Sequence, residues 1–542
     1  MKVGNKWLLR KFIYLIPISV LFVMPITINA KGYTFPEQIG NSPIQFTSID
    51  FPSDSYVVND TGPKLDTYMY RGNGNGDGFD ITIPINIHRY VGDIDKLLET
   101  GLISPTFKIF IPAYDVDYKT HKYFDCDNDG LIDHIYPEQN LVYFNGVVLG
   151  SLKGSNNTWQ FNKQFELDIK KLNFPQNPGD IGYNTIGIKI DVANKDIYMT
   201  SGKGSCKAWA TEIDWAAVKF EVTSPIVFVP GLFGNPASLE KFEYGNNIMH
   251  YTGLPSKVIS HTSFVPSMSA CSSDVIPSLN KHAMEMRDLI KKFAEIYGTD
   301  AVHLISHSKG GLDSRVFLQT LEDNPLFVKV GSMSGYPVKV HLSAESLVTH
   351  GAPHKGSVLA DKLLAHGLDS LAPIISDVCD LTTRVMRTVN SRLGEPPKGV
   401  TTLLIAGDAD QNSDGQISVN EALYNTVEFS NISTLFYEWL RDIAEVYIEY
   451  SHTDGAGHIK FERKIIEIPT NSPQLNDTAV TINSALASVT SFNHTSPAPW
   501  ASDSKKFIGM GYGKNHGSIL YMDVQAFVIN QGLNGTLNWR LR

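Results

Sequence analysis

The stretch "AVHLISHSKGGLDSR" (residues 301–315) decides how the chain is interpreted, because it places Ser308 between an apolar run and a pair of glycines. In an elbow of the G-x-S-x-G type, a serine sits on a tight turn between a strand and a helix, and glycines prevent collisions with neighbouring elements. Here the pattern runs from Ser306 to Gly310, with serine replacing the first glycine. The alternative is an ordinary turn serine, so the rest of the chain has to supply a base, an acid and an oxyanion pocket.

Composition sets broad limits on the class of protein. The chain has 542 residues, of which 42% are hydrophobic and 19% charged, enough for two or three domains with proper cores. The formal net charge of −10 argues against nucleic acid as a partner, because phosphate binding requires a basic surface. We expect a monomer.

The N-terminus has the pattern of a secretory signal. Four basic residues within the first eleven precede the apolar run "FIYLIPISVLFVMPITI", which closes at the small residue Ala30. This pattern predicts a signal peptide over residues 1–30 and a secreted or periplasmic mature protein. An uncleaved membrane anchor is the alternative, which the two prolines inside the run disfavour.

The four cysteines fit an oxidising compartment. Cys126 and Cys206 fall in one half of the chain, and Cys271 and Cys379 in the other. We therefore favour pairing within each half, with free buried thiols as the alternative.

Residues 31–222 show a period of two. Alternating apolar positions separated by Gly, Asn and Pro clusters predict an antiparallel β-sandwich. The isoleucines on the predicted inner faces are Ile81, Ile83, Ile85 and Ile87 in one strand and Ile186, Ile188 and Ile190 in another. The segment "LVYFNGVVLGSLKGSNNTWQFNKQFEL" loosely resembles the jelly-roll sandwiches of many secreted bacterial enzymes. Trp159, Trp209 and Trp215 suggest either a sugar-stacking platform, hence a carbohydrate or surface ligand, or core aromatics.

From Thr223 onward, strands and helices alternate. "PIVFVPG" and "AVHLIS" are apolar strands, and the residues after Gly311 favour a helix. A helix ending at Gly298 is predicted with Met286, Leu289, Ile290, Phe293 and Ile296 on its apolar face. The fold class of residues 223–542 is therefore α/β around a mainly parallel sheet.

Four motifs in this half define a resemblance. "PIVFVPGLFGNP" (225–236), "LISHSKGGLDSR" (304–315), "VTHGAPHKGSVLAD" (348–361) and "NDTAVTINSA" (476–485) occur in the order and rough spacing of the secreted bacterial lipases of the α/β-hydrolase fold. The chain resembles that family from Pro225 to the C-terminus. The third motif is the most specific, because general hydrolase chemistry does not demand it. The sandwich lies outside the resemblance.

The resemblance and the fold order Ser…Asp…His imply a catalytic triad. His516 follows an apolar strand and precedes an apolar segment, with His494 a distant second. Asp477 falls at the family's acid position, although Thr478 replaces the usual glycine after it. Asp408 and Asp454 are competing acids, since both follow plausible strand ends.

The family's oxyanion donors correspond to the amides of Leu232 and Lys309. Pro230 stands where the family has a histidine, which leaves the donor amide in place but changes the pocket wall. A structural strand end is the alternative interpretation of Leu232.

A calcium loop is predicted within "DQNSDGQISVNE", which matches the twelve-residue D-x-[DN]-x-[DN]-G-x5-E pattern in full. The oxygen ligands would come from Asp410, Asn412, Asp414, Gln416, Ser418 and Glu421. A solvated acidic loop is the alternative.

The sandwich contains a second loop with similar spacing, "DCDNDGLID". Its ligands would be Asp125, Asp127, Asp129, the Leu131 carbonyl and Asp133. Position twelve is Tyr136, so the closing carboxylate has to come from elsewhere, with Glu138 a candidate. Both Ca²⁺ sites are expected to be structural. The family's own calcium aspartate is not carried over, because Ser518 occupies that position.

After the third motif the family has a mobile lid, and residues 362–394 here are rich in Leu, Ile and Val. A lid over a lipid cleft and a packed pair of core helices are equally compatible with this pattern. The sequence thus predicts an exported lipase or esterase acting on lipid or ester substrates. A phospholipase, polyester depolymerase or acyltransferase with the same triad is one alternative, and a non-catalytic, calcium-stabilised surface-binding protein is another.

Overall fold

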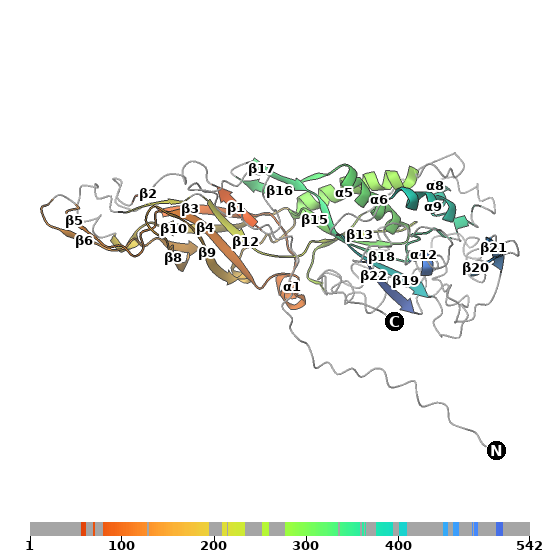
Figure 1. Ribbon diagram of the computed structural model, residues 1–542, viewed down its shortest axis with the longest axis horizontal. Coiled ribbons are helices and arrows are strands. Elements are labelled where there is room, and N and C mark those ends of the chain that lie inside the picture. Colours follow the sequence, from red (N-terminus) through yellow and green to blue (C-terminus); the bar gives the residue numbers. More distant parts are fainter. Residues whose placement is uncertain are drawn as a thin grey trace, which may run out of the picture.

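The computed structural model describes the residues 56–60, 69–70, 80–126, 129–194, 209–213, 215–232, 252–259, 277–333, 336–357, 360–361, 364, 375–393, 400–408, 448–453, 459–464, 480, 482–485 and 506–512. These residues form an elongated molecule with antiparallel strands toward one end and a parallel sheet with helices toward the other (Figure 1). The predicted signal peptide, residues 1–30, lies outside the described residues. Among the described residues, no helix is both long enough and apolar enough to cross a membrane.

Two antiparallel sheets form the first part. One has the order β1 (Tyr56–Asp60), β12 (Trp215–Lys219), β4 (Thr106–Tyr114), β11 (Ala210–Ile213) and β2 (Met69–Tyr70), with β9 (Trp159–Asp168) also paired to β4. The other has the order β3 (Asp80–Ile87), β10 (Gly182–Lys189), β7 (Leu141–Phe144) and β8 (Val147–Ser151). Hairpin β5–β6 (Lys122–Phe124, Asp133–Ile135) lies at the far end (Figure 1).

The sequence period of two produces the sandwich core. The seven predicted inward isoleucines are buried, and they share one cluster with Phe107, Ile109 and Ile111 of β4 in the other sheet. The β7–β8 turn is Asn145-Gly146, with both residues at positive φ, as a tight two-residue hairpin requires. The predicted antiparallel sandwich is confirmed.

Six parallel strands form the second part. Their order is β14 (Ser256–Val258), β13 (Ile226–Val229), β15 (Ala301–His307), β18 (Ser343–His350), β19 (Thr401–Asp408) and β22 (Lys506–Tyr512). The other elements are α1 (Ile94–Thr100), α5 (Pro277–Tyr297), α6 (Lys309–Asp323), α8 (Ile375–Asp380), α9 (Thr383–Arg392), α12 (Ile482–Ala485) and hairpins β16–β17 (Phe327–Met333, Tyr336–His341) and β20–β21 (Ile448–Thr453, Ile459–Lys464). Short 3-10 turns occupy Ile169–Lys171 and Val192–Asn194. The predicted parallel α/β class is confirmed.

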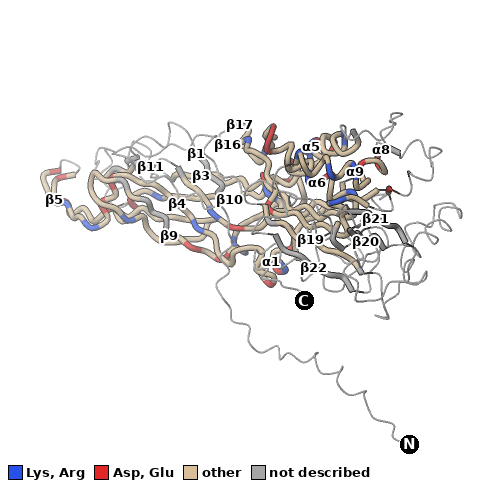
Figure 2. The backbone as a smooth tube through the Cα atoms, turned by 45° about the vertical axis from the view of Figure 1, so that its right-hand side comes forward, with Lys and Arg blue, Asp and Glu red and all other residues tan. Residues whose placement is uncertain are grey.

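Both faces of the parallel sheet are covered. Val227, Val302 and Leu304 belong to a buried cluster with α5 and α6, whereas Phe228, Ile305 and Val348 belong to the cluster that contains the sandwich core. This explains why these strands are continuously apolar rather than alternating. Charged residues of both signs are interspersed along the sandwich strands (Figure 2).

One prediction about the apolar face of helix α5 is wrong. Met286, Ile290 and Phe293 are buried, but Ile296 is 50% exposed, and Ala294 packs into the core instead. The predicted stop is present, because Gly298 has φ +66° and an added Cβ would lie 2.4 Å from the His88 carbonyl oxygen. The close approach of Gly298 to His88 also holds the end of α5 against the segment that follows β3.

That segment, His88 to Asp93, joins the two parts. The amides of Tyr90 and Asp93 donate to the carbonyls of Tyr297 and Gly253 at 3.0 and 2.9 Å. Arg89 is buried, and its guanidinium donates to the Thr223 and Val222 carbonyls at 2.9 and 3.4 Å. The expected domain boundary at residues 222 and 223 lies in this junction, between the end of β12 and the start of β13.

The Arg89→Met variant is expected to lose about 2 kcal/mol of unfolding free energy, because two carbonyls at the junction lose a charged donor. Urea denaturation followed by fluorescence measures this loss. Lys292→Met, at an exposed position of α5, is the matched control and should stay close to wild type. Equal stability of both variants would contradict the importance of the junction.

Candidate active site

Ser308 occupies the turn between β15 and α6 without any intervening residue. Its backbone lies at φ 51° and ψ −128°, in the positive-φ region that non-glycine residues avoid. The turn is fixed on both sides, because the Ser308 amide donates to the His350 carbonyl at 2.9 Å and its own carbonyl accepts from the Gly311 amide at 3.0 Å. The Ser308 residue is nearly buried, with 8% of its surface exposed. This is the strand-to-helix geometry of a nucleophile elbow.

The glycines around Ser308 allow the backbone to approach closely. A Cβ on Gly310 would lie 2.4 Å from the Pro230 carbonyl oxygen, and one on Gly311 would lie 2.5 Å from the Ala352 Cβ. A Cβ on Gly231 would lie 2.6 Å from the Ser308 Cβ. The residues at the end of β13 and the first turn of α6 therefore pack against each other only because these positions lack side chains.

Ser306, which replaces the first glycine of the elbow pattern, is accommodated by hydrogen bonding. Its hydroxyl lies 2.7 Å from the Ser314 hydroxyl, which in turn donates to the Gly310 carbonyl at 2.7 Å. The extra hydroxyl thus links β15 to the first turn of α6 and is not left unpaired in the core.

The two predicted oxyanion donors flank this turn. Lys309 is the first residue of α6, and Leu232 follows Gly231, whose position is in contact with the Ser308 side chain. The carboxyl ends of neighbouring parallel strands β13 and β15 meet at one edge of the sheet. A helix N-terminus at that edge favours negative charge. This edge of the sheet therefore favours a negative charge beside Ser308.

The third motif packs around the elbow. Ala352 contacts Gly311, and the His354 Nε2 lies 3.1 Å from the Thr349 hydroxyl. Asn390 of α9 donates to the His354 carbonyl at 2.7 Å and accepts from Arg315 of α6 at 2.9 Å. These contacts give the motif a packing role at the carboxyl end of β18.

The remaining predicted triad residues, Asp477 and His516, lie outside the described residues, as do the alternatives Asp454 and His494. The elements next to them are described. Ser484 of α12 accepts from the Lys355 amide at 3.0 Å and donates to the Gly356 carbonyl at 2.6 Å, so the third and fourth motifs are in contact. Asp408, the other competing acid, ends β19 and pairs with Tyr512 at the end of β22.

The region predicted as either a lid or a pair of core helices is described at α8 and α9. Val378, Leu381, Val385, Met386 and Val389 are buried in the cluster that contains α5 and α6. Residues 375–393 therefore form packed core helices, while most of residues 362–374 lie outside the described part of the chain.

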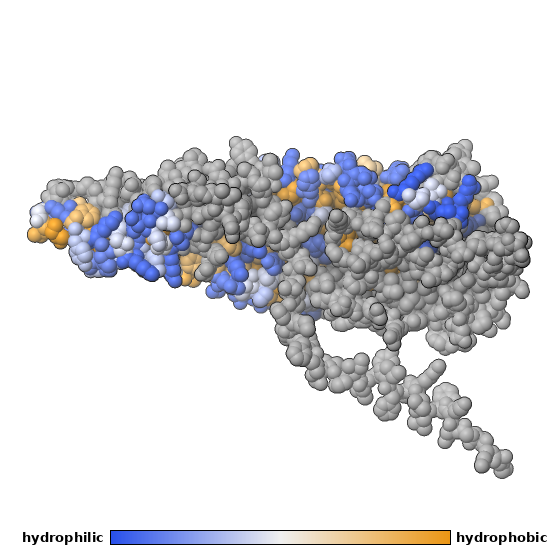
Figure 3. All heavy atoms as spheres, in the orientation of Figure 1, coloured by the Kyte–Doolittle hydropathy of each residue, from blue (hydrophilic) through white to orange (hydrophobic). Residues whose placement is uncertain are grey.

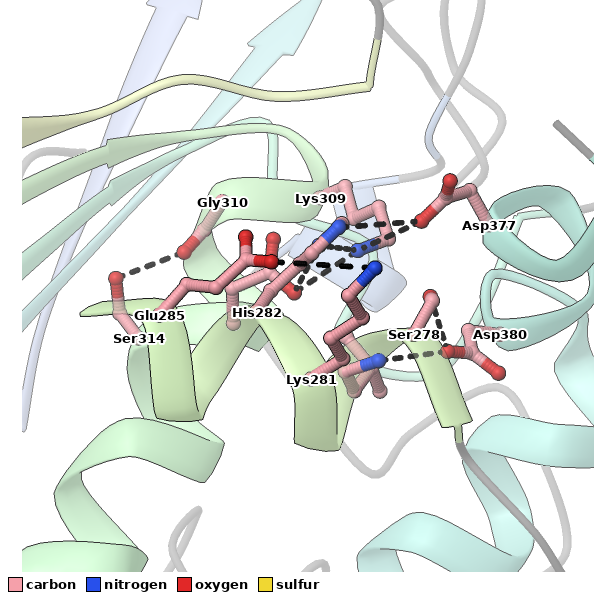
Figure 4. A network of polar contacts seen from close by, with 11 residues as sticks. Ser278, Lys281, His282, Glu285, Lys309, Gly310, Ser314, Asp377 and Asp380 are labelled. Atoms are coloured by element: carbon pink, nitrogen blue, oxygen red, sulfur yellow. Dashed lines mark hydrogen bonds and ion pairs between the residues drawn. The ribbon is translucent and has the colours of Figure 1, made fainter. Parts of the chain in front are cut away.

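The Lys309 side chain belongs to a site that the sequence analysis missed. The sequence analysis gives a role only to its backbone amide, yet its ammonium is buried and paired with Asp313. His282 and Asp377 also lie beside the ammonium (Figure 4). The i, i+4 spacing of Lys309 and Asp313 was the available signal. The partners on α5 and α8 could not be identified from spacing.

Of the two predicted calcium loops, residues 410–421 lie outside the described residues, and so does Asp127 of the sandwich loop. In that loop, Asp125 accepts from the amides of Asp129 and Gly130 at 3.1 and 2.9 Å, and Asp133 accepts from the Cys126 amide at 2.9 Å. Gly130 has φ +87°, which suits the sharp turn of a calcium loop. The described residues alone contain no group of three metal-binding side chains.

Glu138, the suggested closing ligand, is engaged elsewhere. It is buried, and its carboxylate oxygens accept from the Asp117 amide at 2.8 Å and the Asn140 side chain at 2.9 Å. Burial raises the pKa of this carboxyl group to about 8, and the charge of Asp191 adds to this, against the effect of the hydrogen bonds. It lines a cavity of about 460 Å³ with Tyr118, Tyr136, Pro137, Gln139, Ser151 and Ala193.

Other features of the sandwich bear on its predicted ligand. Trp209 is buried and its indole N–H donates to the Tyr136 carbonyl at 2.7 Å, which favours the core interpretation for this residue. The side chains of Trp159 and Trp215 lie outside the described part. Leu131 and Ile132 are each 69% exposed near hairpin β5–β6, where apolar colour gathers at the tip in Figure 3.

The described cysteines, Cys126 and Cys379, are both disulfide-bonded. Cys206 and Cys271, their expected partners, lie outside the described residues.

The order of the parallel strands together with the serine elbow after β15 defines the α/β-hydrolase fold. No family model and no curated protein sequence matches the chain. Among solved structures, the chain is similar to the lipase BlEst2 of Bacillus licheniformis in mature form (18% identity, 57% of this chain and 92% of that one, TM-score 0.33). It is also similar to lipase 1 of Pelosinus fermentans (16% identity, 58% and 98%, TM-score 0.32) and to phospholipase PlaB of Legionella pneumophila (14% identity, 45% and 50%, TM-score 0.25).

Gly310→Ala is expected to lower the unfolding free energy by about 2 kcal/mol, because the new methyl group meets the backbone carbonyls of Val229 and Pro230 at the end of β13. Gly187→Ala is the matched control, since its Cβ would make only ordinary contact with Tyr143 at 3.5 Å. Thermal melts of both variants measure the difference. A Gly310→Ala protein as stable as Gly187→Ala would show that the elbow is not tightly packed.

Glu138→Gln is expected to become more stable relative to wild type as the pH rises from 4 to 9. The folded-state pKa of Glu138, about 8, exceeds its ordinary value of 4.5. The folded protein therefore holds a proton that the unfolded chain releases, and wild type loses a few kcal/mol of stability across this interval. Urea denaturation of both proteins across the pH series measures the effect. A pH-independent difference between them would contradict the raised pKa.

Proposed function

We propose that this protein is an exported serine hydrolase that cleaves carboxylic esters, a lipase or esterase. The observation that carries the proposal is the Ser308 backbone, held at positive φ between β15 and α6 and in contact with the end of β13. A serine at this point of a parallel α/β sheet is placed to attack a carbonyl carbon whose oxygen faces backbone amides. Export rests on the N-terminal sequence pattern.

The proposed reaction is acyl transfer in two steps. The Ser308 oxygen attacks the ester carbonyl while His516 takes its proton, and the amides of Leu232 and Lys309 stabilise the oxyanion. The tetrahedral intermediate expels the alcohol, which receives the proton from His516. Water then attacks the acyl carbon while His516 takes its proton. The bond from that carbon to the Ser308 oxygen breaks, His516 returns the proton to Ser308, and the carboxylic acid is released. Asp477 orients the imidazole.

The positions of the described strands support the order of the triad. Strand β22 runs parallel to β15 and ends at Tyr512, four residues before His516, so the chain emerges at the edge of the sheet that carries Ser308. Val480, three residues after Asp477, is buried in the same cluster as α6. Because only 8% of the Ser308 surface is exposed, the proposal requires neighbouring segments to part when a substrate enters.

Calcium is proposed as a structural ion. The residues that would hold it are Asp410, Asn412, Asp414, Gln416, Ser418 and Glu421 in one loop, and Asp125, Asp127, Asp129, Leu131 and Asp133 in the other. The positive φ of Gly130 and the hydrogen bond from the Asp129 amide to Asp125 fit the sharp turn of such a loop. A carbohydrate or other surface ligand is proposed for the sandwich, with the cavity beside Tyr118 and Tyr136 as its candidate site.

A fluorophosphonate probe should label wild type at Ser308, and Ser308→Ala should lose both labelling and p-nitrophenyl ester hydrolysis by at least about 10³-fold. Ser391→Ala, at an exposed serine of α9, is the matched control and should behave as wild type. Asp477→Asn is expected to reduce hydrolysis far more than Asp408→Asn. Equal background hydrolysis by wild type and Ser308→Ala, for every ester tested, would favour a non-catalytic surface-binding protein.

The same preparation separates the remaining alternatives. A series of acyl chain lengths, triglycerides, phospholipids and polyesters distinguishes lipase and esterase from phospholipase and polyester depolymerase. Transfer to an added alcohol identifies an acyltransferase. A chelator should lower the thermal midpoint while leaving probe labelling intact at low temperature, as expected for structural calcium.

A further inference from the structure

The residue directly after the proposed nucleophile has a buried charge. Lys309 is only 2% exposed, although it begins a helix at the edge of the sheet. Its ammonium donates to the Asp313 carboxylate at 2.9 Å and to the His282 Nδ1 at 2.7 Å, and it lies 3.3 Å from the Asp377 carboxylate. All three partners are themselves buried. A lysine side chain in this setting has a fixed position.

The partners come from three helices. His282 lies on α5, Asp313 on α6 and Asp377 on α8, and Figure 4 shows His282 and Asp377 converging on the Lys309 ammonium. A second carboxylate of α8, Asp380, accepts from the Ser278 hydroxyl at 2.5 Å and the Leu279 amide at 2.9 Å at the start of α5. Helices α5 and α8 are therefore held together beside the first turn of α6.

The neighbouring carboxylates determine the protonation state of Lys309. Burial alone lowers the pKa of Lys309, but the carboxylates of Asp313, Asp377 and Asp380 raise it above its ordinary value. The ammonium is thus charged and paired. The His282 Nε2 lies 3.9 Å from the Asp377 carboxylate, so the imidazole ring lies between the Lys309 ammonium and α8.

Stability alone does not account for this arrangement. Desolvation of buried ions is costly, and apolar residues of similar size are often as stable or more stable. What the ion cluster adds is a fixed orientation of the Lys309 side chain. Contacts from three helices hold that side chain and therefore also hold the Lys309 Cα. The Lys309 amide precedes that Cα and is the proposed oxyanion donor adjoining Ser308.

We propose that the Lys309 side chain is a positioning residue that, through Asp313, His282 and Asp377, holds the Lys309 amide in line with the oxyanion formed at Ser308. This inference rests on the proposed ester hydrolysis. Oxyanion donors act only when they are preorganised toward the charge that develops, and functional geometry tolerates shifts of about 0.5 Å and 10–20°. A loosened Lys309 would therefore affect the transition state more than substrate binding.

The test compares Lys309→Met, which keeps the length of the side chain without its charge, with Asp377→Asn, which loosens the cluster from α8 without altering the elbow. Lys309→Met should lower kcat roughly 10- to 100-fold with KM within about twofold of wild type, and should slow fluorophosphonate labelling by a similar factor. Asp377→Asn should show the same pattern with a smaller loss, about 3- to 10-fold. Because Asp377→Asn is the milder change, it still tests the inference if Lys309→Met fails to fold.

Arg287→Met is the matched control, because buried Arg287 of α5 donates to the Thr320 and Asn324 carbonyls at the far end of α6, at 2.8 Å each, and lies outside the Lys309 cluster. It should lower the thermal midpoint while kcat stays within about twofold of wild type. Two results would overturn the inference. One is a wild-type kcat in a folded Lys309→Met or Asp377→Asn protein, and the other is a loss of kcat that follows the thermal midpoint equally in all three variants. Absence of labelling in wild type would instead reject the proposed function, so the two failures are distinguishable.

Discussion

The turn from β15 into α6 at Ser308 is the constraint on which the rest of the structure depends. A non-glycine residue at positive φ costs on the order of 1–3 kcal/mol and persists only where its surroundings determine it completely. Here the strand pairing to His350, the hydrogen bond to Gly311 and the close approach of Gly231 supply that determination. The surrounding glycines are required because β13 and α6 approach too closely for side chains.

This turn can be rigid because the sheet beneath it is buried on both faces. One face packs on α5 and α6, and the other shares a cluster with the sandwich, so apolar residues of β13, β15, β18 and β19 are divided between two cores. The sandwich is therefore part of the support for the α/β half, and the Arg89 contacts seal the junction between them. The sandwich thus supports the sheet that carries Ser308, in addition to any role that it has in binding a ligand.

Local pattern was enough to predict the elements, and long-range pairing was not. The isoleucines of β3 and β10 and the apolar strands β13 and β15 follow from periodicity alone. Ile296 was assigned to the core because helical spacing cannot show where the supporting sheet ends. The partners of Lys309 lie 27 and 68 residues away, at His282 and Asp377, and nothing in their local sequence distinguishes them from surface residues. Trp209 shows the same limit, since the hydrogen-bond acceptor of its buried indole N–H is the Tyr136 carbonyl, 73 residues away in the sequence.

The elbow at Ser308 and the buried ion cluster around Lys309 both bear on one physical problem, which is how the turn between β15 and α6 keeps its geometry. Backbone strain at Ser308 raises the proposed nucleophile out of the sheet, but a strained turn can relax by rotating the peptide that follows it. The Gly311 amide of α6 holds the carbonyl of that peptide, but the first amides of a helix have no intrahelical acceptor, so α6 cannot fix the Lys309 amide at its other end. A side chain anchored to two other helices can, and Lys309 is the first position after Ser308 where such an anchor is possible. The charge of that side chain is what makes the anchor directional, since apolar packing would allow the methylene chain to slide.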